Sequence, residues 1–325
     1  MTLHENEKLF RQSVAFTAQQ MSIKAIYVEK DYWVTYALKV LFTSELKSKL
    51  VFKGGTALSK CFQLIERFSE DVDLVVLRNQ VESGNELKKT ITKVSKILSE
   101  TLPEIEVENV THKMGMNRKT AHSYNKSFQG KYGQVRDVII VEATWLGNHE
   151  PYIAKNVQSF IYEMMKKSNQ ADLINTYNLN PFPVNALMPT RTLCEKIMSL
   201  VRFSYGENPI EDLGMKIRHP YDLYFLLKDK KIKSFFDSKH FDEMLFKVAN
   251  DDVVSFKNNN KWLIYHPVDA LIFNETEDVW KKLSPIYNED FKDLVYGALP
   301  DEKEVLKTLN LIRKRIEKMP WNLSV

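Results

Sequence analysis

The chain of 325 residues has few cysteines, only a modest excess of positive charge and no long apolar run. Its two cysteines, Cys61 and Cys194, fall in expected helices beside apolar positions, which indicates buried free thiols in a reducing compartment. No run approaches the roughly 18–20 apolar residues of a membrane-spanning helix. The first residues lack the basic start and apolar core of a signal peptide. We therefore expect a soluble, cytoplasmic protein, and the formal net charge of +4 permits nucleic acid as a partner without requiring it.

Glycine is also scarce, at ten residues, yet two glycines stand side by side at Gly54 and Gly55. Residues 51–53 read as a short strand, and the residues after the glycines read as a helix that Thr56 can open. Apolar residues at i, i+3, i+4 and i+7 support this helix: Leu58, Cys61, Phe62 and Ile65. A glycine turn before a helix lets backbone N–H groups approach a phosphate closely. The stretch therefore predicts a strand–turn–helix unit suited to phosphate.

Two aspartates follow on a second expected strand, in which Asp71, Asp73 and Val75 alternate with Val72, Leu74 and Val76. A period of two places Asp71 and Asp73 on one face, about 7 Å apart along the strand. Two carboxylates at that spacing can share a divalent metal. Together the glycine turn and the aspartate pair indicate a site for Mg²⁺ (or Mn²⁺) and a nucleoside triphosphate.

The same residues carry a family resemblance. Gly-Gly-Thr followed by Arg-Phe-Ser-Glu-Asp-Val-Asp-Leu at 67–74 resembles the signature of the nucleotidyltransferase superfamily, a glycine pair and then a D-x-D strand. The Arg-x-Ser before the aspartates, and a gap from the glycines that is longer than the general pattern, are similar to the AbiEii family. Its members are the toxin halves of abortive-infection toxin–antitoxin pairs. The resemblance extends from about Glu29 to Leu226 and implies an enzyme neutralised by a cognate antitoxin.

One carboxylate, Glu142, lies inside the most strongly apolar expected strand, residues 135–145. A lone charge in such a run is costly unless it is paired or metal-bound. The residues leave two interpretations open: a strand-end glutamate that faces solvent or forms a salt bridge, or a third metal ligand beside Asp71 and Asp73. The resemblance supports the metal ligand, because related enzymes carry a third acidic residue on a neighbouring strand. Asp137 is a competitor at the polar edge of this strand.

A helix with an apolar stripe is expected after residue 190, formed by Leu193, Ile197, Leu200 and Val201. Lys196 lies on the flank of the stripe, where a lysine can extend harmlessly to solvent, and Arg202 lies well away from it. Residues 189–196 nevertheless resemble the family's third motif, a helix with a lysine and then an arginine. The resemblance implies that Lys196 contacts the triphosphate as a mobile point charge and that Arg202 is the arginine of the motif.

The run Arg-His-Pro-Tyr-Asp-Leu-Tyr at 218–224 resembles the family's fourth motif, in which an aspartate opens a helix. Asp222 is then either an N-cap or first-turn residue, stabilising the helix by ~0.5–2 kcal/mol, or a functional residue. In the functional interpretation it positions Lys196 or acts on the incoming nucleotide or the acceptor.

Three other segments complete the expected organisation. A helix through about Phe42 contains Lys30, which either packs within the fold or contacts substrate. Residues 111–133 are polar and basic, which fits a solvated hairpin or loop or an excursion that contacts a polyanion. Residues 175–189 are rich in Asn and Pro and are expected to form a connection. We place the domain boundary there, between a nucleotidyltransferase-like catalytic domain at 1–185 and a mainly helical domain at 186–325 that completes the nucleotide cleft.

The predicted fold class is α+β, with a mixed β-sheet of α/β type flanked by helices in the N-terminal part and a mainly helical C-terminal part. The predicted metal ligands are Asp71, Asp73 and Glu142, and the predicted catalytic set adds Lys196 and Asp222. The predicted nucleotide-binding residues are Lys53, Gly54, Gly55, Thr56, Ser69, Lys196 and Arg202. The expected reaction moves a nucleoside monophosphate from a nucleoside triphosphate to an acceptor, either an RNA such as tRNA or a protein.

Two alternatives remain open from the residues. A metal-dependent nuclease also uses Asp and Glu on adjacent strands, but it commonly has Glu-x-Lys on the second strand where this chain has Glu142-Ala143-Thr144. A non-catalytic nucleotide-binding protein could keep the same fold, although every part of the glycine–aspartate signature is present.

Overall fold

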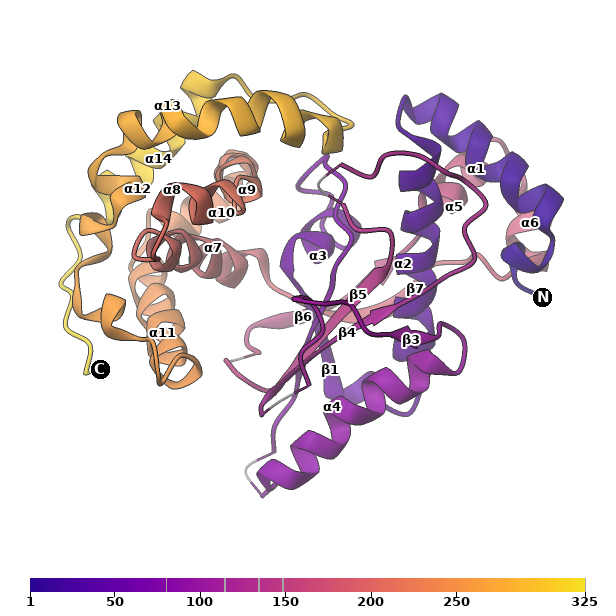
Figure 1. Cartoon of the computed structure of the whole chain (residues 1–325), viewed down its shortest axis with the longest axis horizontal. Helices are drawn as coiled ribbons and strands as arrows, with labels where there is room; N and C mark the ends of the chain where they lie inside the picture. Colours follow the sequence, from indigo (N-terminus) through magenta and orange to yellow (C-terminus); the bar gives the residue numbers. More distant parts are fainter. Residues whose placement is uncertain (80, 114, 134, 148, 325) are drawn as a thin grey trace. The chain divides into compact units, whose positions relative to one another are not determined.

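The computed structural model describes residues 1–79, 81–113, 115–133, 135–147 and 149–324, which group into two compact units. The first unit comprises Met1–Gln63, Phe68–Trp145 and Tyr152–Ala186, and the second comprises Leu64–Arg67, Leu146–Pro151 and Leu187–Val325. The expected class is confirmed: a mixed sheet flanked by helices is followed by a mainly helical part (Figure 1).

The first unit contains both strands and helices. Its strands are β1 (Leu50–Lys53), β2 (Val72–Val76), β3 (Glu104–Ile105), β4 (Asn117–His122), β5 (Ile139–Thr144), β6 (Tyr152–Val157) and β7 (Phe182–Leu187). Its helices are α1 (Glu7–Met21), α2 (Ala25–Thr43), α3 (Gly54–Lys60), α4 (Gly84–Ser99), α5 (Phe160–Lys167) and α6 (Ala171–Thr176). In the described residues the strands form one sheet in the order β3-β4-β5-β2-β1-β7-β6. The sheet is mixed, because β2–β5 and β1–β7 are parallel whereas β1–β2, β3–β4 and β4–β5 are antiparallel.

The two faces of the central strands differ in chemistry. Phe52, Leu74 and Val141 belong to a buried core that also includes the inner sides of α2 and α4. Side chains alternate along a strand, so the residues between them, among them Asp73 and Glu142, point to the opposite face. Burial of one face therefore sets the register that brings the acidic residues together.

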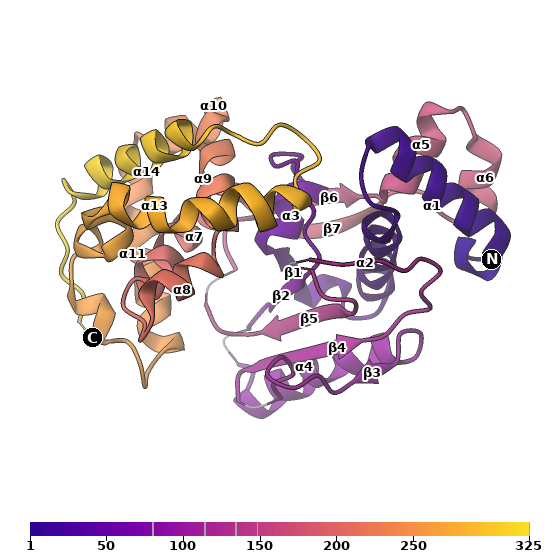
Figure 2. The same ribbon diagram turned by 45° about the horizontal axis from the view of Figure 1, so that its top comes forward.

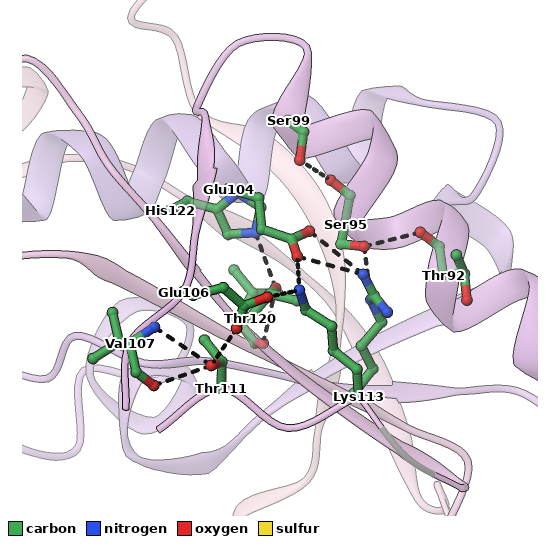
Figure 3. Close-up of polar contacts among 12 residues, drawn as sticks. Thr92, Ser95, Ser99, Glu104, Glu106, Val107, Thr111, Lys113, Thr120 and His122 are labelled. Atoms are coloured by element: carbon green, nitrogen blue, oxygen red, sulfur yellow. Dashed lines mark hydrogen bonds and ion pairs between the residues drawn. The ribbon is translucent and has the colours of Figure 1, made fainter. Parts of the chain in front are cut away.

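Helix α4 is bounded by local signals and packs beside β3 and β4 (Figure 2). Ser83 accepts a hydrogen bond from the Glu86 backbone N–H, and the Glu86 carboxylate accepts one from Ser83, which forms a capping box. At this edge of the sheet, polar side chains of α4, β3 and β4 join in one network (Figure 3). Its central carboxylate, Glu104, accepts from Lys113 Nζ at 2.8 Å.

Two strands were not expected. The polar, basic stretch 111–133 contains β4, so the prediction of a hairpin or loop there was incomplete. The stretch 175–189, expected to be a connection, contains β7, which pairs with β1 through Phe52 and Ala186. Helix α3 is also shorter than its apolar stripe suggested, because it ends at Lys60 and Gln63 adopts a left-handed φ of 53°.

The second unit is helical. Its helices are α7 (Pro189–Phe203), α8 (Pro209–Gly214), α9 (Arg218–Lys228), α10 (Lys230–Phe236), α11 (Lys239–Ser255), α12 (Leu271–Asn274), α13 (Thr276–Ile286) and α14 (Glu302–Ile316). Pro189 begins α7 at a position where its missing N–H leaves no helical bond unmade. Helix α7 packs against α9 and α11, and α14 packs against α9. Across the described residues of both units, none of the helices combines the length and apolarity needed to cross a membrane.

Candidate functional site

A row of four charged residues crosses four adjacent strands of the first unit. Lys53 of β1 pairs with Asp73 of β2, Asp73 pairs with Glu142 of β5, and Glu142 pairs with Lys119 of β4. Directly opposed residues share a face, with Cβ atoms about 4.5–5.5 Å apart. The sheet therefore brings the two predicted carboxylates together and encloses them between two ammonium groups.

The glycine bend lies against this row. Gly54 has a left-handed φ of 79°, and a Cβ added there would overlap Asp73 Oδ2 and lie 3.2 Å from its Cγ. Only a residue without a side chain allows this backbone to approach the carboxylate so closely.

Helix α3 begins at Gly54 itself, so the expectation that Thr56 opens the helix is wrong. The residue at the N-cap position is Lys53, whose side chain makes no capping hydrogen bond. The Thr56 hydroxyl instead donates to Ser69 Oγ at 2.9 Å. This bond ties the helix to the segment that leads into the aspartates.

The electrostatics of Asp73 are unfavourable without a bound cation. Burial, together with the nearby carboxylates of Asp71 and Glu142, raises the pKa of Asp73 to about 7. Asp71 lies two positions before it in the chain, and the Asp71 Oδ1 is buried with no hydrogen-bond partner among the described residues. Carboxylate oxygens of this kind are the ligands that Mg²⁺ and Mn²⁺ prefer. The donor atoms of Asp71 and Asp73 thus fit a divalent cation.

Glu142 is already paired. Its Oε1 accepts a hydrogen bond from Asn117 Nδ2 at 2.9 Å, and its Oε2 lies 3.3 Å from Lys119 Nζ. Burial raises the pKa of Glu142, but the Lys119 ammonium and the Asn117 bond outweigh that effect, so its pKa lies below the ordinary value. Within the described ranges, no group of three or more His, Cys, Asp or Glu side chains is gathered to hold an ion. The metal role of Glu142 stays a prediction, and the salt bridge expected in the competing interpretation is present.

A buried ion pair fixes the chain just before Asp71. The Lys30 ammonium of α2 donates to Glu70 and to the Arg136 carbonyl, and both Lys30 and Glu70 are fully buried. Glu70 also accepts from the backbone N–H of Arg136 at 3.0 Å. Lys30 therefore packs within the fold, which is the structural one of its two expected roles.

In the second unit, Asp222 joins two cations in the interior. Its carboxylate accepts two hydrogen bonds from Arg67, Nε to Oδ1 at 2.7 Å and Nη2 to Oδ2 at 2.8 Å, and Lys196 Nζ lies 2.6 Å from Oδ2. Burial alone would raise the pKa of Asp222, but the Arg67 and Lys196 charges hold it well below its usual range. The carboxylate is therefore ionised and neutralises one of the two positive charges.

These contacts decide two earlier alternatives. Asp222 does not open a helix, because α9 starts at Arg218 and Asp222 lies in its second turn, fully buried. Lys196 is buried against Asp222 rather than extended to solvent. Arg202, the third basic residue of the expected set, lies over the rings of Phe203 and Phe256, at 4.7 and 4.2 Å from their centroids.

Comparison with protein families adds the decisive observation. The model of the family described as "Nucleotidyl transferase AbiEii toxin, Type IV TA system" matches residues 36–308. The chain belongs to the AbiEii family. It is therefore a nucleotidyltransferase of a toxin family, and that family implies a nucleotide substrate and a cognate antitoxin.

A search of curated proteins found no match. Among solved structures, the chain is similar to MenT4, a nucleotidyltransferase toxin from Mycobacterium tuberculosis H37Rv, with 16% identity and a TM-score of 0.49 over 92% of this chain and 98% of that chain.

Three residues that touch the predicted site of this AbiEii-family chain were missed from the sequence. Arg67 was noted only as part of a motif, and nothing local showed that it binds Asp222, which is 155 positions away. Asn117 and Lys119 lie in the unexpected strand β4. The local signal was weak, because residues 117–120 are all polar and the basic composition of the segment is typical of a solvated loop.

Proposed function

We propose that this AbiEii-family protein transfers a nucleoside monophosphate from a nucleoside triphosphate to an acceptor, with a divalent metal at Asp71 and Asp73. The observation that carries the proposal is the close approach of Gly54 to Asp73, beside Glu142 on the adjacent strand. A glycine bend against paired carboxylates supports a polyphosphate-binding backbone beside a cation site in this proposal.

The reaction needs few protein groups. An acceptor hydroxyl oxygen attacks the α-phosphorus, the bond from that phosphorus to pyrophosphate breaks, and the hydroxyl proton passes to water. Mg²⁺ or Mn²⁺, when bound, supplies positive charge that activates the hydroxyl and offsets the charge that develops on the phosphates. Asp71 and Asp73 would hold it, and Glu142 would join them where its pairing with Lys119 opens.

The remaining predicted residues hold the nucleotide in this proposal. Backbone N–H groups at Gly54 and Gly55, with the hydroxyls of Thr56 and Ser69, offer donors to phosphate oxygens, and Lys53 offers a charge. Arg67 and Lys196 share the single carboxylate of Asp222, so these three side chains together keep a net positive charge. We assign Lys196 to the triphosphate on that ground, with Asp222 as the residue that positions it.

A direct test is incubation of the purified protein with NTPs labelled at the α-phosphate, Mg²⁺ and total RNA. The proposal predicts label that joins RNA, or the protein fraction, together with release of pyrophosphate. Shortened RNA without label would support a nuclease, and NTP binding without transfer would support a non-catalytic binding protein.

The variant that tests the site in this assay is Asp73→Asn, which keeps the size of the side chain and removes its charge. It should eliminate transfer while leaving the circular dichroism spectrum unchanged. Full transfer by this variant would refute the proposed site.

A further inference from the structure

The row of charged residues on the sheet contains a cation, Lys119, directly beside Glu142, the predicted third metal ligand. Lys119 Nζ lies 3.3 Å from Glu142 Oε2, and the two side chains are 30% and 32% exposed. The pair is therefore reachable from solvent. The other oxygen of Glu142 is held by a neutral donor, Asn117 Nδ2, at 2.9 Å.

We propose that Lys119 is an internal counter-cation that competes with the divalent metal for Glu142 and so weakens metal binding in the absence of nucleotide. The inference rests on the metal site of the proposed function. In this inference Lys119 of β4 lowers the affinity for the metal, a role that the nucleotidyltransferase reaction itself does not require.

Charge counting supports competition. When all three carboxylates are ionised, Asp71, Asp73 and Glu142 carry three negative charges, and Lys53 and Lys119 carry two positive charges on the same row of paired residues. A divalent cation added to this group would convert its net charge from −1 to +1. Departure of Lys119 returns the sum to zero, so metal binding and the Lys119–Glu142 contact oppose one another.

The geometry allows this departure at small cost. An ammonium on a flexible four-carbon stem can move from a half-exposed ion pair into water, because such pairs contribute little to stability. Asn117 would keep Glu142 oriented when Lys119 leaves, since the hydrogen bond that its neutral Nδ2 donates to Oε1 does not depend on Lys119. Glu142 could then present Oε2 to the cation without a rearrangement of β5.

A matched control lies at the edge of the same sheet. Lys113 is 34% exposed and pairs with Glu104 at 2.8 Å and with Glu106, in the network shown in Figure 3. Replacing it removes the same charge from a similar ion pair. Its carboxylate partners do not include Asp71, Asp73 or Glu142.

The test is titration of the full-length protein with Mn²⁺ alone, with free Mn²⁺ measured by electron paramagnetic resonance and no nucleotide present. Lys119→Met and Lys119→Gln should each bind Mn²⁺ about five- to tenfold more tightly than the unchanged protein. Lys119→Arg retains the charge and should bind as the unchanged protein does. Lys113→Met should also leave the affinity unchanged.

The outcomes separate this inference from the proposed function. Equal or weaker Mn²⁺ binding by folded Lys119→Met and Lys119→Gln overturns the counter-cation role, as does equal tightening by Lys113→Met. Asp73→Asn should eliminate the binding. If Asp73→Asn binds Mn²⁺ normally, the metal site itself is wrong, whereas its failure to bind, with no effect at Lys119, overturns only the inference.

Discussion

Replacement of Gly54 by alanine perturbs the contact on which the proposed site depends. Two effects act together. The left-handed φ of 79° costs any residue with a Cβ about 1–2 kcal/mol relative to glycine. The added methyl would also overlap Asp73 Oδ2 and lie 3.2 Å from Cγ, so the carboxylate must move by roughly 1 Å.

Whether the substitution mainly lowers the free energy of unfolding or the rate of transfer depends on whether the Asp73 side chain moves. If the Asp73 side chain rotates, the free energy of unfolding falls by about 1–2 kcal/mol, the backbone part alone. If it stays, overpacking adds about 1–3 kcal/mol. In the first case the carboxylate leaves its place, and a displacement near 1 Å at a reacting centre costs about 100-fold in rate.

Urea unfolding and single-turnover label transfer measure the two parts of the effect. Gly84→Ala is the matched control, because Gly84 has open space around its Cα and begins helix α4, so alanine there should change the unfolding free energy by at most about 1 kcal/mol and leave transfer unchanged. A Gly54→Ala protein that transfers label at the normal rate would refute the role assigned to the glycine bend.

Three other perturbations test the charges. Lys196→Met should weaken NTP binding about 10- to 100-fold, the contribution of one charge-assisted hydrogen bond, and should weaken NMP binding much less. Equal losses of NTP and NMP affinity in competition binding would show that Lys196 does not contact the triphosphate. Asp222→Ala removes the buried carboxylate that Arg67 and Lys196 share and should lower the free energy of unfolding by about 3–5 kcal/mol in urea. A loss below about 1 kcal/mol would contradict the role of this buried triad. Because the pKa of Asp73 is raised to about 7 from its ordinary 3.8, the metal-free folded protein retains a proton that the unfolded chain releases, so its stability should fall as the pH rises from about 4 to about 7. Asp73→Asn should lack this component in urea melts across that range, and an unchanged pH dependence in the variant would assign it to another group.

Local patterns were sufficient for part of the site. The alternation around Asp71 and Asp73 predicted β2. The resemblance implied that Glu142 lies on a neighbouring strand, and the parallel pairing of Asp73 with Glu142 agrees with this. The glycine pair was also recognisable, since two adjacent glycines between a strand and a helix are a strong local signal.

Non-local pairing explains the parts that were missed. Strand β4 reads as a polar basic loop because its order comes from hydrogen bonds to β5 and from the contacts of Asn117 and Lys119 with Glu142. Strand β7 contains Pro183, which normally counts against a strand. The Arg67–Asp222 pair joins residues 155 positions apart, and no local spacing encodes such a contact.

The most direct test of the proposed metal centre is a crystal grown with Mn²⁺ and a non-hydrolysable NTP, with the ion located by anomalous scattering. The account predicts an anomalous peak in direct coordination by Asp71 and Asp73, with the phosphates of the nucleotide at the Gly54 bend. A peak elsewhere, with these two carboxylates free of metal and the bend free of phosphate, would contradict it.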